Sequence, residues 1–339
     1  MDSRSLLNVR HLSVEYASPG GTIRAVRDVS VEISAAETLA VVGETGSGKS
    51  TLALAILGLL DDTARWEAGA IAFDGCNIQA RRKSGRSRIL GSGIGAVFQD
   101  ARSALNPVLT VRDHLVETLR AHRRLSKKEA AAKSLDLLRE VGIPASHAGL
   151  YPFELSGGIS QRVGIALSIC NNPRLLIADE PTSALDPMIQ MQILGLLLRM
   201  RQRHGVALLL ISHDLDLVAR LTDRIAIMYH GRIVESGERN EVLHSPAHPY
   251  TRGLLQCRPG PEHHYDAKPM RSIPCTLPLP GQEFPGCAFA PRCGRSAPDC
   301  VAAVPGRFEI SETHWVSCLH CGDTGGGGVE GHRIGANDH

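Results

Sequence analysis

The segment GETGSGKST, residues 43–51, has the residue types and spacing of a phosphate-binding loop. It fits the pattern G-x-x-x-x-G-K-[ST], follows the apolar run TLAVVG and leads into the helical pattern STLALAILGLL. Glycines let backbone amides turn inward around phosphate oxygens, and a helix N-terminus favours negative charge. A glycine-rich turn that only connects a strand to a helix is the alternative, and the flanking strand and helix argue against it. The residues expected to bind a nucleotide are Gly43, Gly46, Ser47, Gly48, Lys49, Ser50 and Thr51, with Lys49 reaching the β- and γ-phosphates and Ser50 holding Mg²⁺.

The segment RLLIADEPTSALD, residues 174–186, places two carboxylates at the end of an apolar strand. Asp179 is positioned to meet Mg²⁺ through water. Glu180 follows it and is positioned to polarise an attacking water as general base. An acidic pair that merely faces solvent is the alternative, and the phosphate-binding loop upstream makes that interpretation weaker.

The segment LSGGISQR, residues 155–162, has the composition of a helix start that can receive an anion. Ser156 and the amides of Gly157 and Gly158 open the helix, and helix N-termini attract negative charge. The simpler interpretation is a helix N-cap formed by Ser156. Both interpretations can hold together, because a capping serine still presents donors to a phosphate.

Apolar strand patterns alternate along the chain with segments of helical, 3.6-residue periodicity. This alternation predicts an α/β fold with a mostly parallel sheet. Apolar strands are expected at residues 38–43, 94–98, 174–179, 206–212 and 224–229, with helices between them. The stretch from Thr110 to about Val163 is expected to be a mostly helical insertion, because VRDHLVETLRAH and KKEAAAKSLDLLREVG both show 3.6-residue spacing. We expect an ATP-binding domain over residues 1–245 with a helical subdomain at about 100–165. An irregular Pro- and Cys-rich extension is expected over 246–322 and a flexible tail over 323–339.

Charge and hydropathy argue against direct binding to nucleic acid and against direct insertion into a membrane. The net charge is +2, which gives no general attraction to nucleic acid. The basic segment RRKSGRSR, residues 81–88, has no interleaved aromatic residues, so a solvated loop is the better interpretation. The N-terminus lacks the apolar region of a secretory signal, and no apolar run approaches the ~20 residues that span a bilayer. Any association with a membrane is therefore expected to come through a partner.

Six motifs follow one another in a fixed order: GETGSGKST, AVFQD, LSGGISQR, LLIADE, SALD and LLLISHD. In this order they resemble the ATP-binding subunit of an ABC transporter. The resemblance implies a P-loop ATPase core, an antiparallel β N-terminal part and an inserted helical subdomain. It also implies that two ATP molecules lie between two such subunits. The phosphate-binding loop of one subunit then faces Ser156, Gly157 and Gly158 of the other.

The resemblance also implies roles for four further residues. Gln99 contacts the metal or the attacking water, and His213 holds the γ-phosphate. Asp186 signals across the dimer, while Tyr16 stacks on adenine. The alternatives are a structural histidine and an ordinary strand aromatic. Because the catalytic set is complete, we expect ATP hydrolysis rather than binding alone.

Seven of the nine cysteines lie from Cys257 onward, and twelve of the nineteen prolines lie between Pro246 and Pro305. HPYTRGLL and GCAFAPRC in this region resemble the C-terminal extension of peptide and nickel importer ATPases. Four thiolates can hold a [4Fe–4S] cluster or a tetrahedral Zn²⁺ ion. The absence of Cys-x₂-Cys pairs among them, together with the iron–sulfur cluster that the resemblance implies for some relatives with this extension, favours the cluster. Plain buried thiols are the third interpretation, and the clustering of the cysteines argues against it. The expected ligands are Cys287, Cys293, Cys300 and Cys318, with Cys321 able to replace Cys318.

The sequence therefore predicts an ATPase that energises import of oligopeptides or dipeptides through a membrane permease. The same role in a nickel or metal-chelate importer is the alternative, and a non-transport ATPase in DNA repair or translation is a further one. The expected partners are a second ATPase subunit, either a paralogue or another copy, two permease subunits and, indirectly, an extracytoplasmic solute-binding protein. The expected location is the cytoplasmic face of the plasma membrane. Because the ATPase does not touch the cargo, no residue here identifies the substrate.

Overall fold

A computed structural model describes residues 5–78, 89–183, 185–257, 273, 277–279 and 281–321. Two expectations fall outside the described residues: the solvated loop at 81–88 and the flexible tail at 323–339. Among the described residues, no helix has the length and apolar character needed to cross a membrane.

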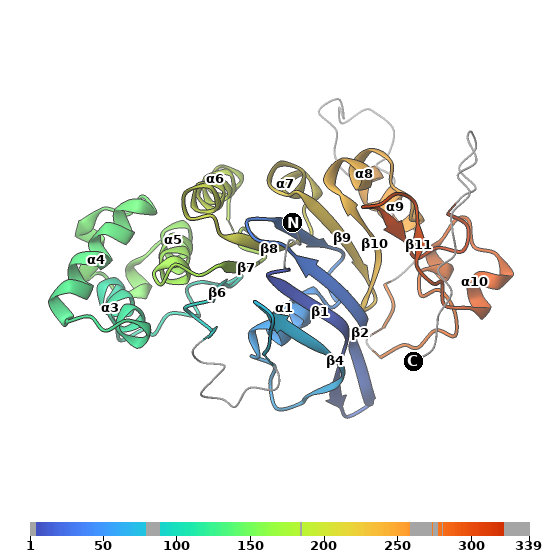
Figure 1. The fold of residues 1–339 in the computed structure, drawn as a ribbon, viewed down its shortest axis with the longest axis horizontal. Coiled ribbons are helices and arrows are strands. Elements are labelled where there is room, and N and C mark those ends of the chain that lie inside the picture. The colour runs from blue at the N-terminus through green and yellow to red at the C-terminus, as the bar shows by residue number, and fades with distance from the viewer. Residues whose placement is uncertain are drawn as a thin grey trace.

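An eight-stranded sheet crosses the middle of the molecule (Figure 1). Its strand order is β11-β12-β10-β9-β3-β8-β7-β6, parallel from β9 to β6 and antiparallel from β9 to β11. The mostly parallel sheet is thus confirmed. The strands of its parallel part are β3 (Thr38–Val42), β6 (Ile94–Val97), β7 (Leu175–Asp179), β8 (Ala207–Ser212) and β9 (Arg224–Tyr229), and β10 covers Arg232–Glu238.

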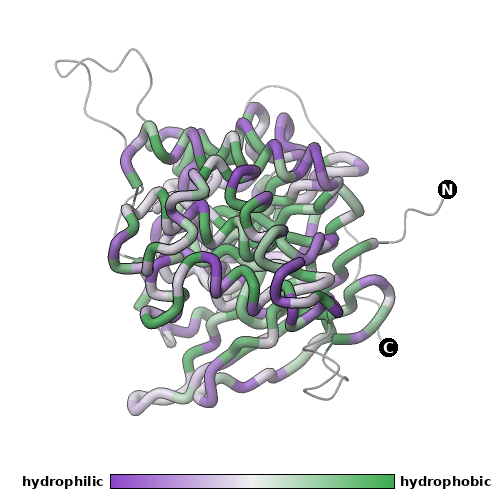
Figure 2. Tube along the Cα trace, turned by 90° about the vertical axis from the view of Figure 1, so that its left-hand side faces the viewer, coloured by the Kyte–Doolittle hydropathy of each residue, from purple (hydrophilic) through white to green (hydrophobic). Residues whose placement is uncertain are grey.

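Alternate residues of these strands serve two separate cores, because successive side chains point to opposite faces of a sheet. Ala40 and Val42 pack in the core shared with the helices of the insertion, while Leu39 and Val41 pack in the core shared with the N-terminal strands. Both faces are covered, so the strands are continuous apolar runs. Figure 2 shows the hydrophobic segments running through the interior and many hydrophilic ones at the outer turns.

A four-stranded antiparallel sheet, of order β2-β1-β4-β5, covers one side of the main sheet. Helix α1 (Lys49–Leu57) is buried in the same core. The antiparallel N-terminal part is confirmed. Its strands are β1 (Leu7–Ser18), β2 (Gly21–Ile33), β4 (Ala64–Phe73) and β5 (Cys76–Asn77).

The helical insertion forms one end of the molecule, beyond β6 (Figure 1). Two of its helices begin with capping boxes, in which Thr110 accepts from the amide of Asp113 and Ser126 from that of Glu129. The helical periodicity of VRDHLVETLRAH matches α3 in full. The helices are α3 (Val111–His122), α4 (Lys127–Glu140) and α5 (Gly157–Ile169), followed after β7 by α6 (Pro187–His204) and α7 (Leu215–Leu221).

The C-terminal extension lies at the opposite end from the insertion (Figure 1). The sequence predicted an irregular segment, yet its last two strands, β11 (Phe308–Glu309) and β12 (Trp315–Val316), continue the main sheet beyond β10. Such two-residue strands leave no periodic signal. Helix α8 (Arg239–His244) precedes the extension, and within its described residues lie α9 (Pro249–Gln256) and α10 (Pro298–Ala302).

A buried carboxylate fixes the extension to the sheet. Glu235, in β10, is fully buried and accepts from the amides of Ala247 and His248 at 2.7 and 2.9 Å. His314 Nε2 lies 2.8 Å from the same carboxylate. A buried charge needs such partners, so the start and the end of the extension are both tied to β10. The division of the chain at residue 245 stays a prediction.

Candidate nucleotide-binding site

The glycine-rich loop joins β3 to α1 and is packed against backbone on its inner side. A Cβ atom at Gly43 would lie 2.1 Å from the carbonyl oxygen of Met228. Gly48 has φ of 103° and caps α1, and a Cβ there would lie 2.2 Å from the carbonyl oxygen of Ala25. Only glycine fits at these two positions, which explains the residue types of the motif.

Lys49 is buried and folded back onto the loop. Its Nζ donates to the carbonyl oxygens of Gly43 and Glu44 at 2.8 and 2.9 Å, and to Ser47 Oγ at 3.3 Å. Burial lowers the pKa of Lys49, and the carboxylates of Glu180, Asp179 and Glu44 oppose this shift. The ammonium is thus held by the loop itself, within reach of an anion that the loop would receive.

Two acidic residues at the end of β7 meet the loop. Ser50 Oγ donates to Asp179 Oδ1 at 3.2 Å. Burial raises the pKa of Asp179, and the bond from Ser50 opposes it. Glu180 has a φ of 43°, a left-handed conformation that costs about 1–3 kcal/mol in a residue other than glycine and that recurs at functional sites. His213 Nδ1 lies 3.3 Å from Glu180 Oε1, so the expected γ-phosphate ligand and the expected base are neighbours.

An open pocket lies over the loop and is lined by eight of the sixteen residues predicted for ATP and Mg²⁺. It is lined by Gln99 and Glu180 together with loop residues Gly46 to Thr51. Tyr16 is not among its lining residues, but its Oη is 3.5 Å from Thr51 Oγ1, so it borders the loop. Sequence reasoning did not assign the other lining residues. Glu44 and Thr45 belong to the loop but stand at unspecified positions of its motif. The others come from distant segments and are Ile23, Arg24, Ala25, Tyr229, His230, Gly231, Leu277, Pro278, Leu279 and Gly281.

Ser156, Gly157, Gly158 and Asp186 form a second group, and none of them lines this pocket. Ser156 caps α5, accepting from the amide of Ile159 at 3.4 Å, and Asp186 caps α6. A Cβ at Gly158 would lie 2.8 Å from Ile189 Cγ2, so the starts of α5 and α6 are in contact. The cap predicted for Ser156 is present, and the residues assigned to a partner's nucleotide gather at one surface.

The four cysteines expected to hold a metal line one small cavity, which we call the cysteine cavity. Cys287 and Cys300 are joined through their backbones, with the amide of Cys287 donating to the carbonyl of Cys300 at 2.7 Å. Burial raises the pKa of the thiols of Cys287, Cys293 and Cys318, that of Cys318 to about 11. Buried thiols of this kind ionise only with a compensating cation.

The sequence analysis did not include two side chains of metal-ligating type beside these cysteines, Asp299 and His320, of which His320 lines the cavity. The ligand atoms of Asp299, Cys300 and His320 lie within 4.8 Å of one another. His320 Nε2 is 3.0 Å from Asp299 Oδ1. The signal was present, since His320 stands between Cys318 and Cys321 and Asp299 precedes Cys300, but we counted only the thiols.

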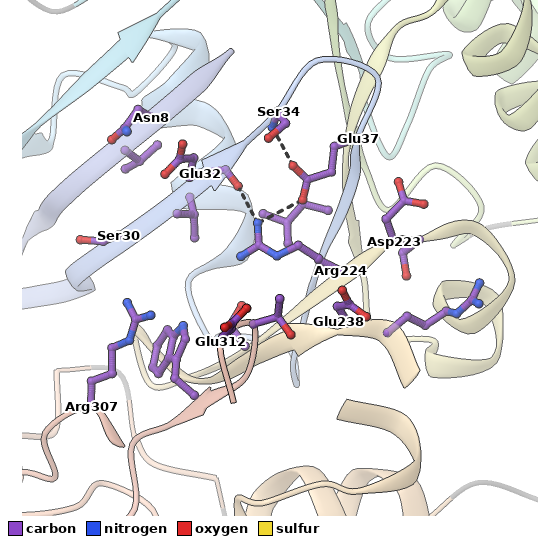
Figure 3. A pocket seen from close by; sticks show the side chains of 18 of the residues that line it. Asn8, Ser30, Glu32, Ser34, Glu37, Asp223, Arg224, Glu238, Arg307 and Glu312 are labelled. Atoms are coloured by element: carbon purple, nitrogen blue, oxygen red, sulfur yellow. Dashed lines mark hydrogen bonds and ion pairs between the residues drawn. The ribbon is translucent and has the colours of Figure 1, made fainter. Parts of the chain in front are cut away.

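A larger hollow lies away from the loop and holds none of the predicted site residues (Figure 3). Charges of both signs line it, and Arg224 Nη1 bridges Glu37 Oε1 at 3.1 Å and the carbonyl of Glu32 at 3.3 Å. Arg307, from the extension, stacks on Trp315 at its edge, 4.7 Å from the ring centroid. Because this hollow has paired charged side chains, we interpret it as a polar contact region between the N-terminal strands and the extension.

Comparison with known proteins identifies two regions of the chain. Residues 26–183 match the ABC transporter family, and residues 234–300 match the family described as the oligopeptide/dipeptide transporter, C-terminal region. The dipeptide transport ATP-binding protein DppD of Escherichia coli is 40% identical over 324 residues, covering 95% of this chain and 98% of that one. A putative peptide import ATP-binding protein of Brucella melitensis is 43% identical over 302 residues, covering 88% and 90%.

Among solved structures, the ATP-binding cassette MJ0796, determined as a dimer in a post-hydrolysis state with ADP and Pi, resembles this chain. The TM-score is 0.63 at 27% identity, over 69% of this chain and 98% of that one. Nearly the whole of the solved cassette can therefore be superposed on this chain, so the two proteins share the cassette fold.

Proposed function

The chain belongs to the ABC transporter family as an ATPase subunit, and from this membership we propose that it energises import of oligopeptides or dipeptides through a membrane permease. The observation that carries the proposal is similarity over nearly the whole chain, extension included, to a dipeptide transport subunit. A nickel importer and a repair or translation ATPase lose support, because the matched C-terminal region and both relatives are named for peptides.

The hydrolytic step is assigned to residues around the loop. Backbone amides of Gly46 to Thr51 and the ammonium of Lys49 bind the phosphates. Ser50 Oγ and Asp179 Oδ1, 3.2 Å apart, are two oxygens suited to one Mg²⁺, with Gln99 as a further ligand. The metal neutralises phosphate charge when bound. The carboxylate of Glu180 takes the proton of the attacking water, and His213 donates to the γ-phosphate.

The second group of residues acts on a second subunit. We assign Ser156, Gly157 and Gly158 to the triphosphate held by the partner, and Asp186 to communication between the two sites. This assignment is supported by their place at the joined starts of α5 and α6, outside the chain's own pocket. The partner is a paralogue or another copy, and the pair docks on two permease subunits at the cytoplasmic face of the plasma membrane. A solute-binding protein delivers the cargo.

The cysteine cavity is assigned a structural [4Fe–4S] cluster, with Zn²⁺ as the alternative. The four cysteines line one cavity, which supplies the number of thiols that either group needs. Cys287, Cys293, Cys300 and Cys318 are the assigned ligands, with Cys321 able to replace Cys318. Because the Pro-rich extension has few apolar residues to bury, coordination of the metal by four cysteines would supply folding free energy.

Uptake by reconstituted vesicles tests the transport proposal. The chain is assembled with its permease subunits and partner ATPase, and ATP-driven accumulation of a labelled dipeptide is measured. We expect accumulation that requires Lys49, so that Lys49→Ala abolishes it. Accumulation of Ni²⁺ and not of peptides would support the alternative cargo and overturn the proposal.

Elemental analysis tests the cluster. Protein purified anaerobically is expected to contain iron and acid-labile sulfide at about four each per chain. One zinc per chain without sulfide would establish the alternative. Neither metal in a folded protein would contradict both assignments.

A further inference from the structure

Glu44, the second residue of the phosphate-binding loop, is bonded through all three of its polar groups. Its amide donates to Tyr250 Oη at 2.9 Å. Its carbonyl oxygen accepts from Lys49 Nζ at 2.9 Å. Its carboxylate accepts from Arg292 Nη1 and Nη2 at 2.7 and 3.0 Å. One residue therefore connects the ammonium expected to bind phosphate with two side chains that lie more than 200 positions away.

Both distant partners belong to the region after residue 245. Tyr250 is in α9 and is fully buried. Arg292 lies between Cys287 and Cys293, two residues of the cysteine cavity, and its side chain is 5% exposed. A two-pronged arginine–carboxylate bond is directional as well as strong, so it fixes where Glu44 can lie. The extension thus reaches the loop directly.

Packing holds the two partners in place before any ligand arrives. The rings of Tyr229, Tyr250 and Phe289 form a cluster with centroid separations of 4.7–5.4 Å. The guanidinium of Arg292 lies 5.8 and 5.9 Å from the ring centroids of Tyr229 and Phe289. Neither partner of Glu44 is free to change rotamer without disturbing this cluster. The contact is therefore a rigid support.

Charge gives a second reason for the contact. The carboxylate of Glu44 borders the pocket assigned to a triphosphate, where an unpaired negative charge would oppose binding. The guanidinium of Arg292 neutralises that charge at close range. The glycine-rich loop also loses conformational entropy when it closes on phosphate, and holding it beforehand reduces this cost.

We propose that Arg292 and Tyr250 are positioning residues for the phosphate-binding loop, so that the C-terminal extension is required in cis for tight ATP binding. This inference rests on the proposed role of the loop in binding ATP. Neither side chain touches the reacting atoms. Loss of either contact should raise the KM for ATP and leave kcat nearly unchanged.

Equilibrium binding of Mg-ATP to the full-length chain tests the proposal. Arg292→Ala is expected to weaken ATP binding about tenfold or more, since it leaves a half-buried carboxylate unpaired beside the phosphates. Arg292→Lys, which keeps the charge but not the two-pronged bond, should recover part of the affinity. Combining Arg292→Ala with Glu44→Gln should also recover affinity, because the unpaired charge is removed. A merely structural role would show neither recovery.

Arg307→Ala is the matched control, because Arg307 is an arginine of the same extension that stacks on Trp315 and is not a loop contact. Its ATP affinity should stay within twofold of the parent. If Arg292→Ala does not fold, Tyr250→Phe decides, since it removes only the hydroxyl that accepts from Glu44 and should weaken binding several-fold. Folded variants with parental affinity would overturn the inference. A parent chain that fails to bind ATP would instead overturn the proposed function.

Discussion

Replacing Gly48 by alanine should damage the protein in two separable ways. The residue has φ of 103°, where a side chain costs about 1–2 kcal/mol. The new Cβ would also lie 2.2 Å from the carbonyl oxygen of Ala25 and 2.9 Å from Met228 Cε. Met228 can move its flexible end, but Ala25 contributes backbone of β2, and overpacking of this kind costs about 1–3 kcal/mol. The free energy of unfolding should fall by about 2–5 kcal/mol in total.

Urea unfolding of two matched variants measures the parts separately. Gly205, which ends α6, has φ of 62° and open space around the position of a Cβ. Gly205→Ala therefore carries the conformational cost alone, about 1 kcal/mol. Gly48→Ala should lose clearly more free energy of unfolding than Gly205→Ala, and it should also lose ATP binding, since the amides that follow it must shift. Equal losses in the two variants, within about 0.5 kcal/mol, would refute the argument that β2 restricts the loop.

The remaining predictions concern turnover, pH and metal. Glu180→Gln should lower the rate of ATP hydrolysis by about 10²–10⁴ while ATP still binds; a wild-type rate would show that Glu180 is not the base. Burial lowers the pKa of His248 to about 4, and its Nδ1 accepts from the amide of Tyr250 at 3.0 Å. The unfolded chain takes up this proton near pH 6.5 and the folded chain does not, so stability is complete above pH 6.5 and falls by about 3 kcal/mol as the pH drops to 4. His248→Asn keeps an acceptor at this helix start without a titrating ring, so acid unfolding should lose that part of its slope; an unchanged slope would contradict the assignment. If the proposed iron cluster or zinc is present, Cys300→Ser should remove it and lower the unfolding temperature, whereas Cys76→Ser, a change at an exposed cysteine of β5, should change neither; metal retained in the Cys300 variant would exclude that residue as a ligand.

Local sequence was sufficient for the phosphate-binding loop and the strands that flank it. Nine consecutive residues carry the loop's chemistry, and the apolar runs before Gly43 and Asp179 locate both at strand ends. The helix at Val111–His122 lies inside the stretch predicted to be mostly helical, because its periodicity is contained in one short segment, whereas its cap at Thr110 was seen only in the structure. In each case the signal and the structure are contiguous.

The extension shows where such reasoning ends. Its two short strands, at Phe308–Glu309 and Trp315–Val316, carry no period and exist because β10 offers an edge to pair with. The clustering of the cysteines suggested a metal, and Asp299 and His320 stand beside those cysteines in the sequence. Only the fold shows that the ligand atoms of Asp299, Cys300 and His320 lie within 4.8 Å of one another.

The amino-acid sequence therefore specified the class of chemistry, a nucleotide held by a glycine-rich loop and an acidic strand end, because each motif is a short continuous segment. Folding alone brought Arg292 and Tyr250 to Glu44, and His314 to Glu235. The residues joined by these contacts are separated in the sequence by between 79 and 248 positions. Side chains at such separations meet only through the packing of the whole sheet, so no local sequence pattern predicts these contacts.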